Sequence, residues 1–144
     1  MPKVIDSFEN EFAFLSNFYS CIIVYEGIYY PTVEHAFQAA KTLDFEQRKT
    51  IAAAPTPGQA KRLGRKVDLR SDWEEIKDGV MEELVRRKFN SSFILKTMLL
   101  ATGDRELIEG NWWNDTYWGV CKGVGRNQLG KTLMKIREEL RVKD

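Results

Sequence analysis

The chain has 144 residues, with 22 lysines and arginines against 21 aspartates and glutamates, one histidine and two cysteines. This length predicts one domain, residues 1–144, with a single core that needs no disulfide or metal. The formal charge of +1 excludes a protein that coats nucleic acid by net charge alone, although it allows a local basic patch. Because His35 is the only histidine, a histidine-based zinc site is not expected, and the chain is predicted to need no metal and no cofactor.

The cysteines and the apolar segments favour a cytoplasmic location. Cys21 and Cys121 lie far apart and outside any CxxC pattern, so we expect them to stay reduced. Residues 1–11 are mixed and acidic, without the basic and then apolar pattern of a signal peptide. The longest apolar stretches fall far short of the ~20 residues that cross a bilayer. No membrane partner is therefore expected.

The first predicted elements are a β-hairpin and a helix. Residues 21–30 are rich in β-branched and aromatic side chains and are interrupted at Glu26-Gly27, which predicts two short strands and a tight turn. Pro31-Thr32 then predicts a stop and an N-cap. The helix formers that follow predict a helix from Val33 to about Leu43.

Four further helices are predicted from capping residues and apolar spacing. Thr56-Pro57 begins one that continues through residue 63, with proline at its first position. A capping-box sequence at Ser71 begins a long one that ends near residue 89. The other two cover 92–101 and 127 to about 141. The chain is therefore predicted to be an α+β protein, mainly helical, with a small β-sheet.

Glu34, Gln38 and Lys41 stand at i, i+4 and i+7 on the first predicted helix, beside an apolar row. On spacing alone, the simplest interpretation is an amphipathic surface helix whose polar row faces water. If the row instead lines a cleft, Glu34 can serve as acid, base or anchor, and Lys41 as a cation or an amine nucleophile. Their Cα atoms are then about 10 Å apart along the axis, which leaves room for a sugar.

A basic segment follows over residues 59–70. Phosphate is its natural ligand, although the alternative is a basic surface balanced by the acidic residues of 72–83. Its cations are Lys61, Arg62, Arg65, Lys66 and Arg70.

Aromatic side chains gather in residues 111–119, a polar, glycine-rich stretch. Aromatic residues are more often core than ligand clamp, yet Trp112-Trp113 does not follow a core pattern, and an exposed ring would stack a base. The same question applies to Trp73, Tyr117 and Trp118.

Residues 125–132 match the phosphate-binding pattern GxxxxGK[ST]. We interpret the match as incidental, because only twelve residues follow Thr132 and the strand that carries the magnesium-binding aspartate of an NTPase has no room there. The free amides of a glycine-rich turn before a helix can still receive an anion.

Several segments together resemble the NADAR family, also called YbiA-like proteins. None is specific by itself, but all occur in the family's order, between about residues 14 and 136. The segments are Phe14-Leu15-Ser16-Asn17-Phe18-Tyr19, Tyr30–Lys41, Gln59–Arg65, Arg70-Ser71-Asp72-Trp73, Lys88-Phe89, Leu99–Gly103, Asp115–Gly119 and Gly125–Gly130. The last is the family pattern GxNxLG, which accounts for the phosphate-binding match. The loops over 42–56 and 120–124 differ from the family and are expected to set substrate preference.

The resemblance implies a YbiA-like fold and an N-glycosidase that hydrolyses the bond between ribose C1′ and an exocyclic amine. The substrates it implies are phosphoribosylamino-pyrimidine intermediates of riboflavin synthesis, or ADP-ribose on the guanine amino group, free or in nucleic acid. It implies Glu34, Lys41 and Asp115 as catalytic residues. The substrate-binding residues it implies are Asn17, Phe18, Gln38, Lys61, Arg65, Trp73, Trp118, Gly119 and Asn127.

Two mechanisms fit these residues. Lys41 can attack C1′ of a ring-opened imine while Glu34 transfers protons, or Glu34 can activate a water molecule directly. A non-catalytic module that binds ADP-ribose or NAD through the same residues is the competing interpretation.

Overall fold

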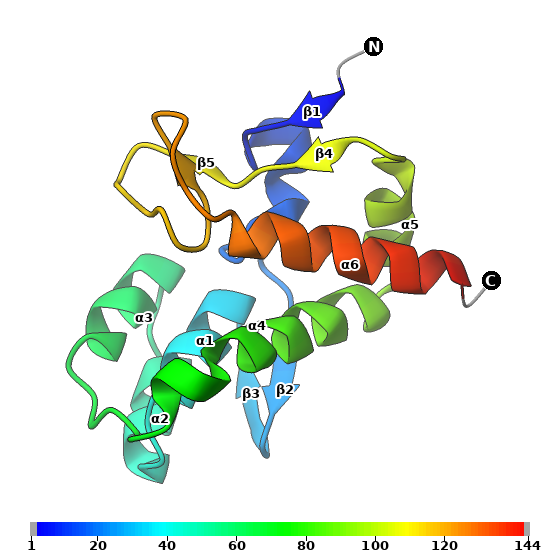
Figure 1. Ribbon diagram of the computed structural model, residues 1–144. Helices are drawn as coiled ribbons and strands as arrows, with labels where there is room; N and C mark the ends of the chain where they lie inside the picture. Colours follow the sequence, from blue (N-terminus) through cyan, green and yellow to red (C-terminus); the bar gives the residue numbers. More distant parts are fainter. Residues whose placement is uncertain (1–2, 143–144) are drawn as a thin grey trace. The chain divides into compact units, whose positions relative to one another are not determined.

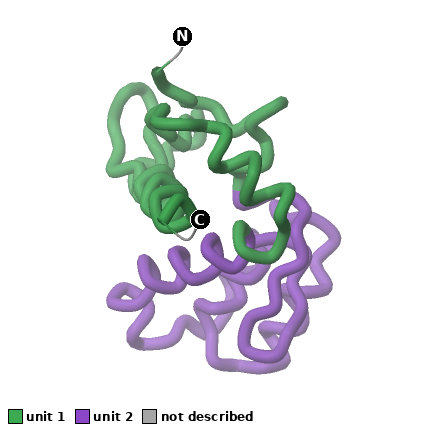
Figure 2. Tube along the Cα trace, turned by 90° about the vertical axis from the view of Figure 1, so that its right-hand side faces the viewer, with its two compact units in different colours: residues 1–16, 89–144 green, residues 17–88 purple. Residues whose placement is uncertain are grey.

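The computed structural model describes residues 3–142 and is mostly helical, with three sheets of two strands each among these residues. This confirms the predicted α+β class. The described chain forms two compact units, one of residues 17–88 and one of residues 3–16 with 89–142 (Figure 2). No helix within residues 3–142 combines the length and the apolar character needed to cross a membrane.

Unit 2 of Figure 2, residues 17–88, contains the predicted hairpin. Strand β2 (Ile23–Tyr25) pairs antiparallel with β3 (Ile28–Tyr30), and Ile23 lies opposite Tyr30. Glu26 and Gly27 connect the strands with φ angles of 47° and 85°, as a two-residue hairpin turn requires. The hairpin prediction is therefore confirmed.

Helix α1 (Val33–Ala40) is buried on every side, so the prediction of an amphipathic surface helix is wrong. It contacts α2 (Phe45–Ala52) and α3 (Pro57–Gly64) (Figure 1). The helix ends at Ala40 rather than near Leu43. Arginine side chains donate hydrogen bonds to backbone carbonyl groups at this end.

The cap of α1 includes the only histidine. Thr32 Oγ1 accepts a hydrogen bond from the His35 amide at 3.1 Å and lies 2.8 Å from His35 Nδ1. The other ring nitrogen lies 3.0 Å from the carbonyl oxygen of Ala54. Both nitrogens are thus engaged, and His35 joins the cap to the residues after α2.

Helix α2 lies where a loop over 42–56 was expected, so that expectation is wrong. Asp44 caps the helix by accepting from the Gln47 amide at 3.0 Å. Only Arg48 and Ile51 are buried within it. Eight residues with two buried positions give too few apolar side chains for a helical period to show in the sequence.

Helix α4 (Trp73–Asn90) is the longest in the described chain. It begins after Asp72, one residue later than a capping box at Ser71 requires. The Asp72 carboxylate pairs with Arg70. The apolar spacing was predicted correctly, since Val80, Met81, Leu84, Val85 and Phe89 are all buried.

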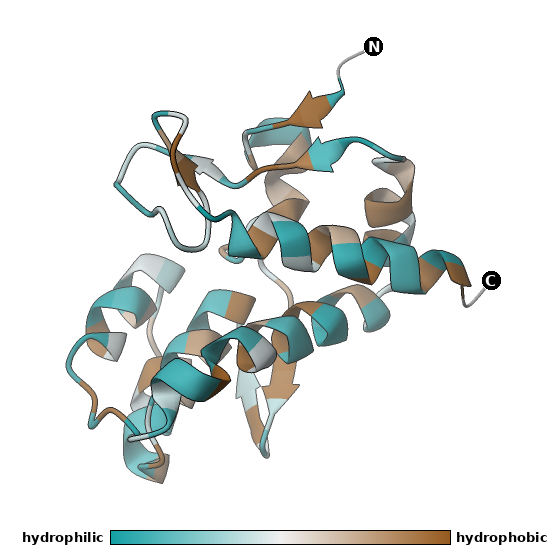
Figure 3. Ribbon diagram, viewed as in Figure 1, coloured by the Kyte–Doolittle hydropathy of each residue, from teal (hydrophilic) through white to brown (hydrophobic). Residues whose placement is uncertain are grey.

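Unit 1 of Figure 2 contains α6 (Gln128–Val142), which contacts β4 (Glu106–Leu107) and α5 (Phe93–Ala101) (Figure 1). Strand β1 (Val4–Ile5) pairs parallel with β4, and β5 (Gly110–Asn111) pairs parallel with β6 (Val120–Cys121). A 3-10 helix, η1, covers Asn10–Leu15. Polar and apolar residues alternate along α6 in Figure 3, and its Leu129, Leu133 and Ile136 are buried as predicted.

Candidate active site

The polar row of α1 is buried rather than solvated. Glu34 is 8% exposed and Gln38 is 4% exposed. Gln38 Nε2 donates a hydrogen bond to Glu34 Oε2 at 2.6 Å, which fixes one oxygen of the carboxylate. A charged group is expensive to bury unless it is paired or hydrogen-bonded, so a buried carboxylate is a candidate for a functional group.

Lys41 occupies the C-cap of α1 and is half-buried. Burial lowers the pKa of its amine, and Glu34 opposes this effect because a nearby negative charge favours the ammonium form. The positive charges of Arg65, Lys61 and Lys77 lower the pKa further. A larger fraction of Lys41 is therefore the nucleophilic free amine at neutral pH than in an exposed lysine.

The five cations of the basic segment have different surroundings. Lys61 and Arg65, on α3 and at its C-cap, both influence the Lys41 amine electrostatically. Arg70 instead pairs with Asp72 at 2.7 Å. Arg62, Arg65 and Lys66 are exposed. Two of the five cations, Lys61 and Arg65, thus act electrostatically on the Lys41 amine, and such positive charges favour an anionic ligand.

Asn17 and Phe18 precede α1 in the chain. The carbonyl oxygen of Asn17 accepts from the Glu34 amide at 3.1 Å, and its side chain contacts the Met81 sulfur at 3.4 Å. Asn17 therefore helps to position the first turn of α1. Phe18 is exposed, and its contact with a ligand stays a prediction.

Trp73 does not offer an open face for stacking. It is 5% exposed, and its ring centroid lies 5.0 Å from that of Phe37 on α1. Within 111–119, by contrast, Trp112 is 83% exposed and Trp113 is 46% exposed. The exposed tryptophan rings are therefore those of Trp112 and Trp113, while Trp73 packs against α1.

Gly64 matters because Gln38 lies directly against it. A Cβ atom at this position would overlap the Gln38 amide. The absence of a side chain at Gly64 therefore lets Gln38 reach Glu34.

We predict that Gly64→Ala lowers kcat about tenfold, because Gln38 must move and the Glu34 carboxylate loses its orientation. Steady-state hydrolysis of the substrate proposed below measures this. The control is Gly79→Ala in α4, where an added Cβ meets nothing within 4 Å; it should keep full activity. Equal rates in the two variants would contradict the role of Gly64.

Asp115 organises the loop before Gly119. Its Oδ1 accepts from the amides of Tyr117 and Trp118 at 3.1 and 2.9 Å. Asn111 closes the loop by donating to the Asp115 carbonyl at 2.9 Å and accepting from its amide at 3.0 Å. At Gly119, an added Cβ would overlap the Glu109 carbonyl. These contacts give Asp115 a clear positioning role for Trp118, while its catalytic role stays a prediction.

Both polar atoms of the Asn127 side chain form hydrogen bonds within the protein. Its Nδ2 donates to the Leu107 carbonyl at 2.9 Å, and its Oδ1 accepts from the Glu109 amide at 3.0 Å. The residue thereby ties the start of α6 to β4. Its predicted contact with sugar or phosphate would compete with these bonds.

The turn before α6 is not an anion site, which corrects the expectation of free amides there. The amides of Arg126, Asn127, Gln128 and Leu129 donate to backbone carbonyl groups of residues 116–119 at 2.8–3.3 Å. At Gly125, an added Cβ would overlap the Gly119 carbonyl. The glycines of this motif therefore allow close packing of backbone, and the phosphate-binding match is incidental.

Lys88, part of the family segment Lys88-Phe89, is a buried amine that is not among the predicted site residues. It is 1% exposed, and its Nζ lies 5.5 Å from the ring centroid of Tyr19. Burial lowers its pKa to about 7, and the nearby Cys21 opposes the shift. A usable signal was present, because Lys88 falls on the apolar stripe of α4 between Leu84, Val85 and Phe89.

This shift predicts that stability rises with pH. The folded pKa of Lys88 lies below its ordinary value of 10.5, so the cost of burying the ammonium is full below pH 7 and fades as the pH rises toward 10.5. Between pH 7 and pH 9 the free energy of unfolding should rise by roughly 2 kcal/mol. Urea unfolding at a series of pH values measures it.

Lys88→Met should abolish most of this rise, while Lys49→Met, at an exposed position of α2, should leave it intact. The same pH dependence in Lys88→Met as in the wild-type chain would show that another group is responsible.

Among residues 3–142, no three His, Cys, Asp or Glu side chains are grouped so that they could hold a metal ion. Cys21 and Cys121 are not joined in a disulfide.

The family model described as "NADAR domain" matches residues 5–141. The chain therefore belongs to the NADAR family. It is 40% identical over 139 residues to the N-glycosidase YbiA of Escherichia coli K12, covering 94% of this chain and 86% of that protein. It is also 43% identical over 130 residues to a riboflavin biosynthesis protein of Vibrio vulnificus, covering 88% of this chain but 35% of that protein. The NMR structure of E. coli YbiA superimposes with a TM-score of 0.86 at 38% identity, covering 99% of this chain and 88% of that one. The family resemblance and the YbiA-like fold are thereby confirmed.

Proposed function

We propose that this chain is an N-glycosidase that hydrolyses the bond between ribose C1′ and the exocyclic amine of phosphoribosylamino-pyrimidines, with Glu34 and Lys41 as its catalytic residues. The names of the E. coli and Vibrio relatives support the enzyme class and a substrate from riboflavin synthesis. The family match spans both compact units, which supports one working domain over residues 1–144.

The observation that carries the proposal is the pair of ionisable groups on α1. Glu34 is a buried carboxylate held by Gln38, and Lys41 is a half-buried amine whose pKa is lowered chiefly by desolvation. A carboxylate suited to proton transfer and an amine suited to attack on carbon thus lie on one short helix.

In the proposed reaction the ribose ring opens to an imine between C1′ and the amine of the base. The free amine of Lys41 adds to C1′, and the Glu34 carboxylate transfers the two protons of the Lys41 nitrogen to the base amine, which departs as C1′ forms its double bond to Lys41. The C1′–Lys41 imine that forms is hydrolysed by water, for which Glu34 is the base. The aldehyde that is released closes to ribose 5-phosphate, and the Lys41 amine is regenerated.

The positive charges beside Lys41 support a substrate that carries phosphate. Lys61 and Arg65 act on the Lys41 amine, so a phosphate bound by them lies close to the reacting sugar. We propose Asn17 and Phe18 as further contacts to this sugar. Trp118 and Gly119, on the loop that Asp115 organises, are proposed as substrate contacts of unit 1.

The decisive experiment compares two substrates in parallel. One is the phosphoribosylamino-pyrimidine, and the other is ADP-ribose attached to the guanine amino group in an oligonucleotide. We expect release of the free pyrimidine amine and ribose 5-phosphate from the first, measured by chromatography. Hydrolysis of the second alone would assign ADP-ribosylated guanine as the substrate, and saturable binding without hydrolysis would show a non-catalytic binding module.

A further inference from the structure

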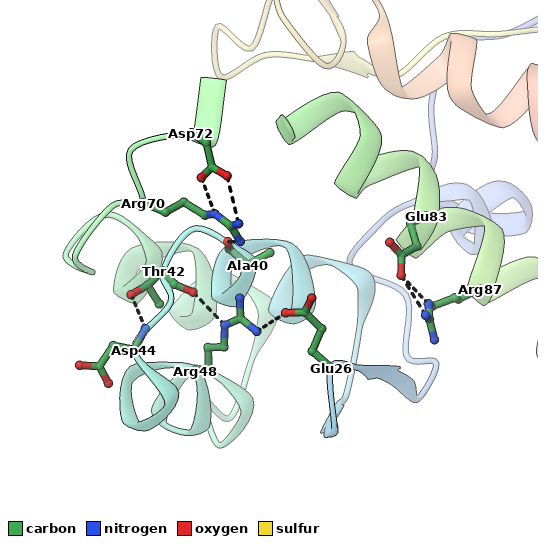
Figure 4. Close-up of polar contacts among 9 residues, drawn as sticks. All are labelled: Glu26, Ala40, Thr42, Asp44, Arg48, Arg70, Asp72, Glu83 and Arg87. Atoms are coloured by element: carbon green, nitrogen blue, oxygen red, sulfur yellow. Dashed lines mark hydrogen bonds and ion pairs between the residues drawn. The ribbon is translucent and has the colours of Figure 1, made fainter. Parts of the chain in front are cut away.

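Two arginines hold the carboxyl end of α1 (Figure 4). Arg70 Nη1 donates to the Ala40 carbonyl at 3.4 Å, and the Arg70 amide donates to the Lys41 carbonyl at 2.8 Å. One residue further on, Arg48 Nε donates to the Thr42 carbonyl at 2.8 Å. The last carbonyl groups of a helix lack partners within it and carry partial negative charge, so guanidinium groups stabilise them.

An acidic side chain holds each arginine in turn. Arg70 Nε and Nη2 donate to the two Asp72 oxygens at 2.7 and 3.2 Å, a bidentate geometry that fixes the plane of the guanidinium. Glu26 accepts from Arg48 Nη1 at 2.6 Å. The hydrogen bond between Arg70 and Asp72 lowers the pKa of the carboxyl group and raises that of the guanidinium, so the pair stays charged at neutral pH.

Lys41 lies within this held segment. Its backbone is in the right-handed helical region, with φ −65° and ψ −20°, so its side chain follows Glu34 and Gln38 around the helix. The Arg70 guanidinium donates to the Ala40 carbonyl, and the Arg70 backbone amide donates to the Lys41 carbonyl. Residue 70 thus holds the peptide groups on both sides of the Lys41 Cα atom, and the guanidinium holds the one that precedes it.

We propose that Arg70, oriented by Asp72, is a positioning residue that aims the Lys41 amine at the reacting carbon. The inference rests on the proposed function, because it gives Arg70 a part in the reaction of Lys41. It assigns Arg70 no contact with substrate, which separates it from the phosphate-binding role of Lys61 and Arg65.

The test compares Arg70→Lys with a matched arginine elsewhere in the same unit. Arg87 also makes two bonds to one carboxylate, Glu83, at 2.9 and 3.1 Å (Figure 4). It makes one further bond to a backbone carbonyl, that of Val24, at 3.1 Å. Both substitutions keep the charge and remove the planar guanidinium. A role in stability alone predicts equal effects on activity.

We expect Arg70→Lys and Asp72→Asn to lower kcat about tenfold and to change KM less than about twofold. Arg87→Lys should leave both constants unchanged. The limb of the pH profile that reports the free amine of Lys41 should move to higher pH in the Arg70 variant, because a loosened Lys41 becomes better solvated and its pKa returns toward the ordinary value. Equal kinetics and pH profiles in Arg70→Lys and Arg87→Lys would overturn the inference.

A second measurement does not depend on activity. Reductive methylation over a pH series, followed by peptide mapping, gives the pKa of Lys41 in each folded variant. A higher Lys41 pKa in Arg70→Lys than in Arg87→Lys supports positioning even if no N-glycoside is hydrolysed, an outcome that would remove only the proposed function. Identical titration of Lys41 in both variants overturns the positioning role whether or not the chain is active.

Discussion

Replacing Glu34 with glutamine is expected to lower kcat/KM about a thousandfold, with thermal stability close to that of the wild-type chain. Glutamine has nearly the shape of glutamate and can still accept the hydrogen bond from Gln38 that is 2.6 Å long in the wild-type chain. It cannot give a proton to the departing amine or take one from water. The loss should therefore fall on kcat, since sugar and phosphate contacts are unchanged.

The measurement is steady-state hydrolysis of the phosphoribosylamino-pyrimidine, with unfolding followed in parallel. Glu83→Gln is the matched control, because Glu83 pairs with Arg87 on the same unit and has no part in the proposed reaction. Wild-type activity in Glu34→Gln would remove Glu34 from the mechanism under both routes considered.

Lys41→Met is expected to cause a loss of similar size, about a thousandfold, if the amine forms a covalent link to C1′. Methionine keeps the length and the apolar part of the side chain, which is half-buried, and removes the nucleophile. Borohydride added during turnover should reduce the imine to a secondary amine, so that peptide mapping finds the reduced, open-chain sugar phosphate on Lys41.

Lys49→Met serves as the control, because Lys49 lies on an exposed part of α2. If Lys41→Met hydrolyses the substrate at the wild-type rate and borohydride traps nothing, the covalent route is excluded. Direct activation of water by Glu34 would then be the mechanism.

Local signals in the sequence predicted much of this architecture. Thr32, Thr56-Pro57 and Ser92 mark helix starts correctly, because capping depends on a few neighbouring atoms. Helix α2 was missed, since only two of its side chains are buried. The burial of α1 on every side was also missed. Its row of polar residues gives the sequence an amphipathic pattern, although Gln38 and Glu34 are buried and bond to each other.

The site was predicted in part. The i, i+4, i+7 spacing identified Glu34, Gln38 and Lys41 as one row, and the structure keeps that row. The engagement of Asn127 and of the amides before α6 depends on carbonyl groups far away in sequence, which spacing cannot reveal. Lys88 was overlooked because a lysine on an apolar stripe is normally expected to extend its amine to solvent.

The enclosed position of α1 has a consequence for motion. Ala36, Ala39 and Ala40 are fully covered, and a helix without a solvent-facing side exchanges its amide hydrogens only when the surrounding unit opens. Deuterium uptake at Glu34 and Lys41 should then be among the slowest in the chain. Peripheral segments would then have to move to admit a bulky ligand, while the reacting groups on α1 keep a fixed geometry.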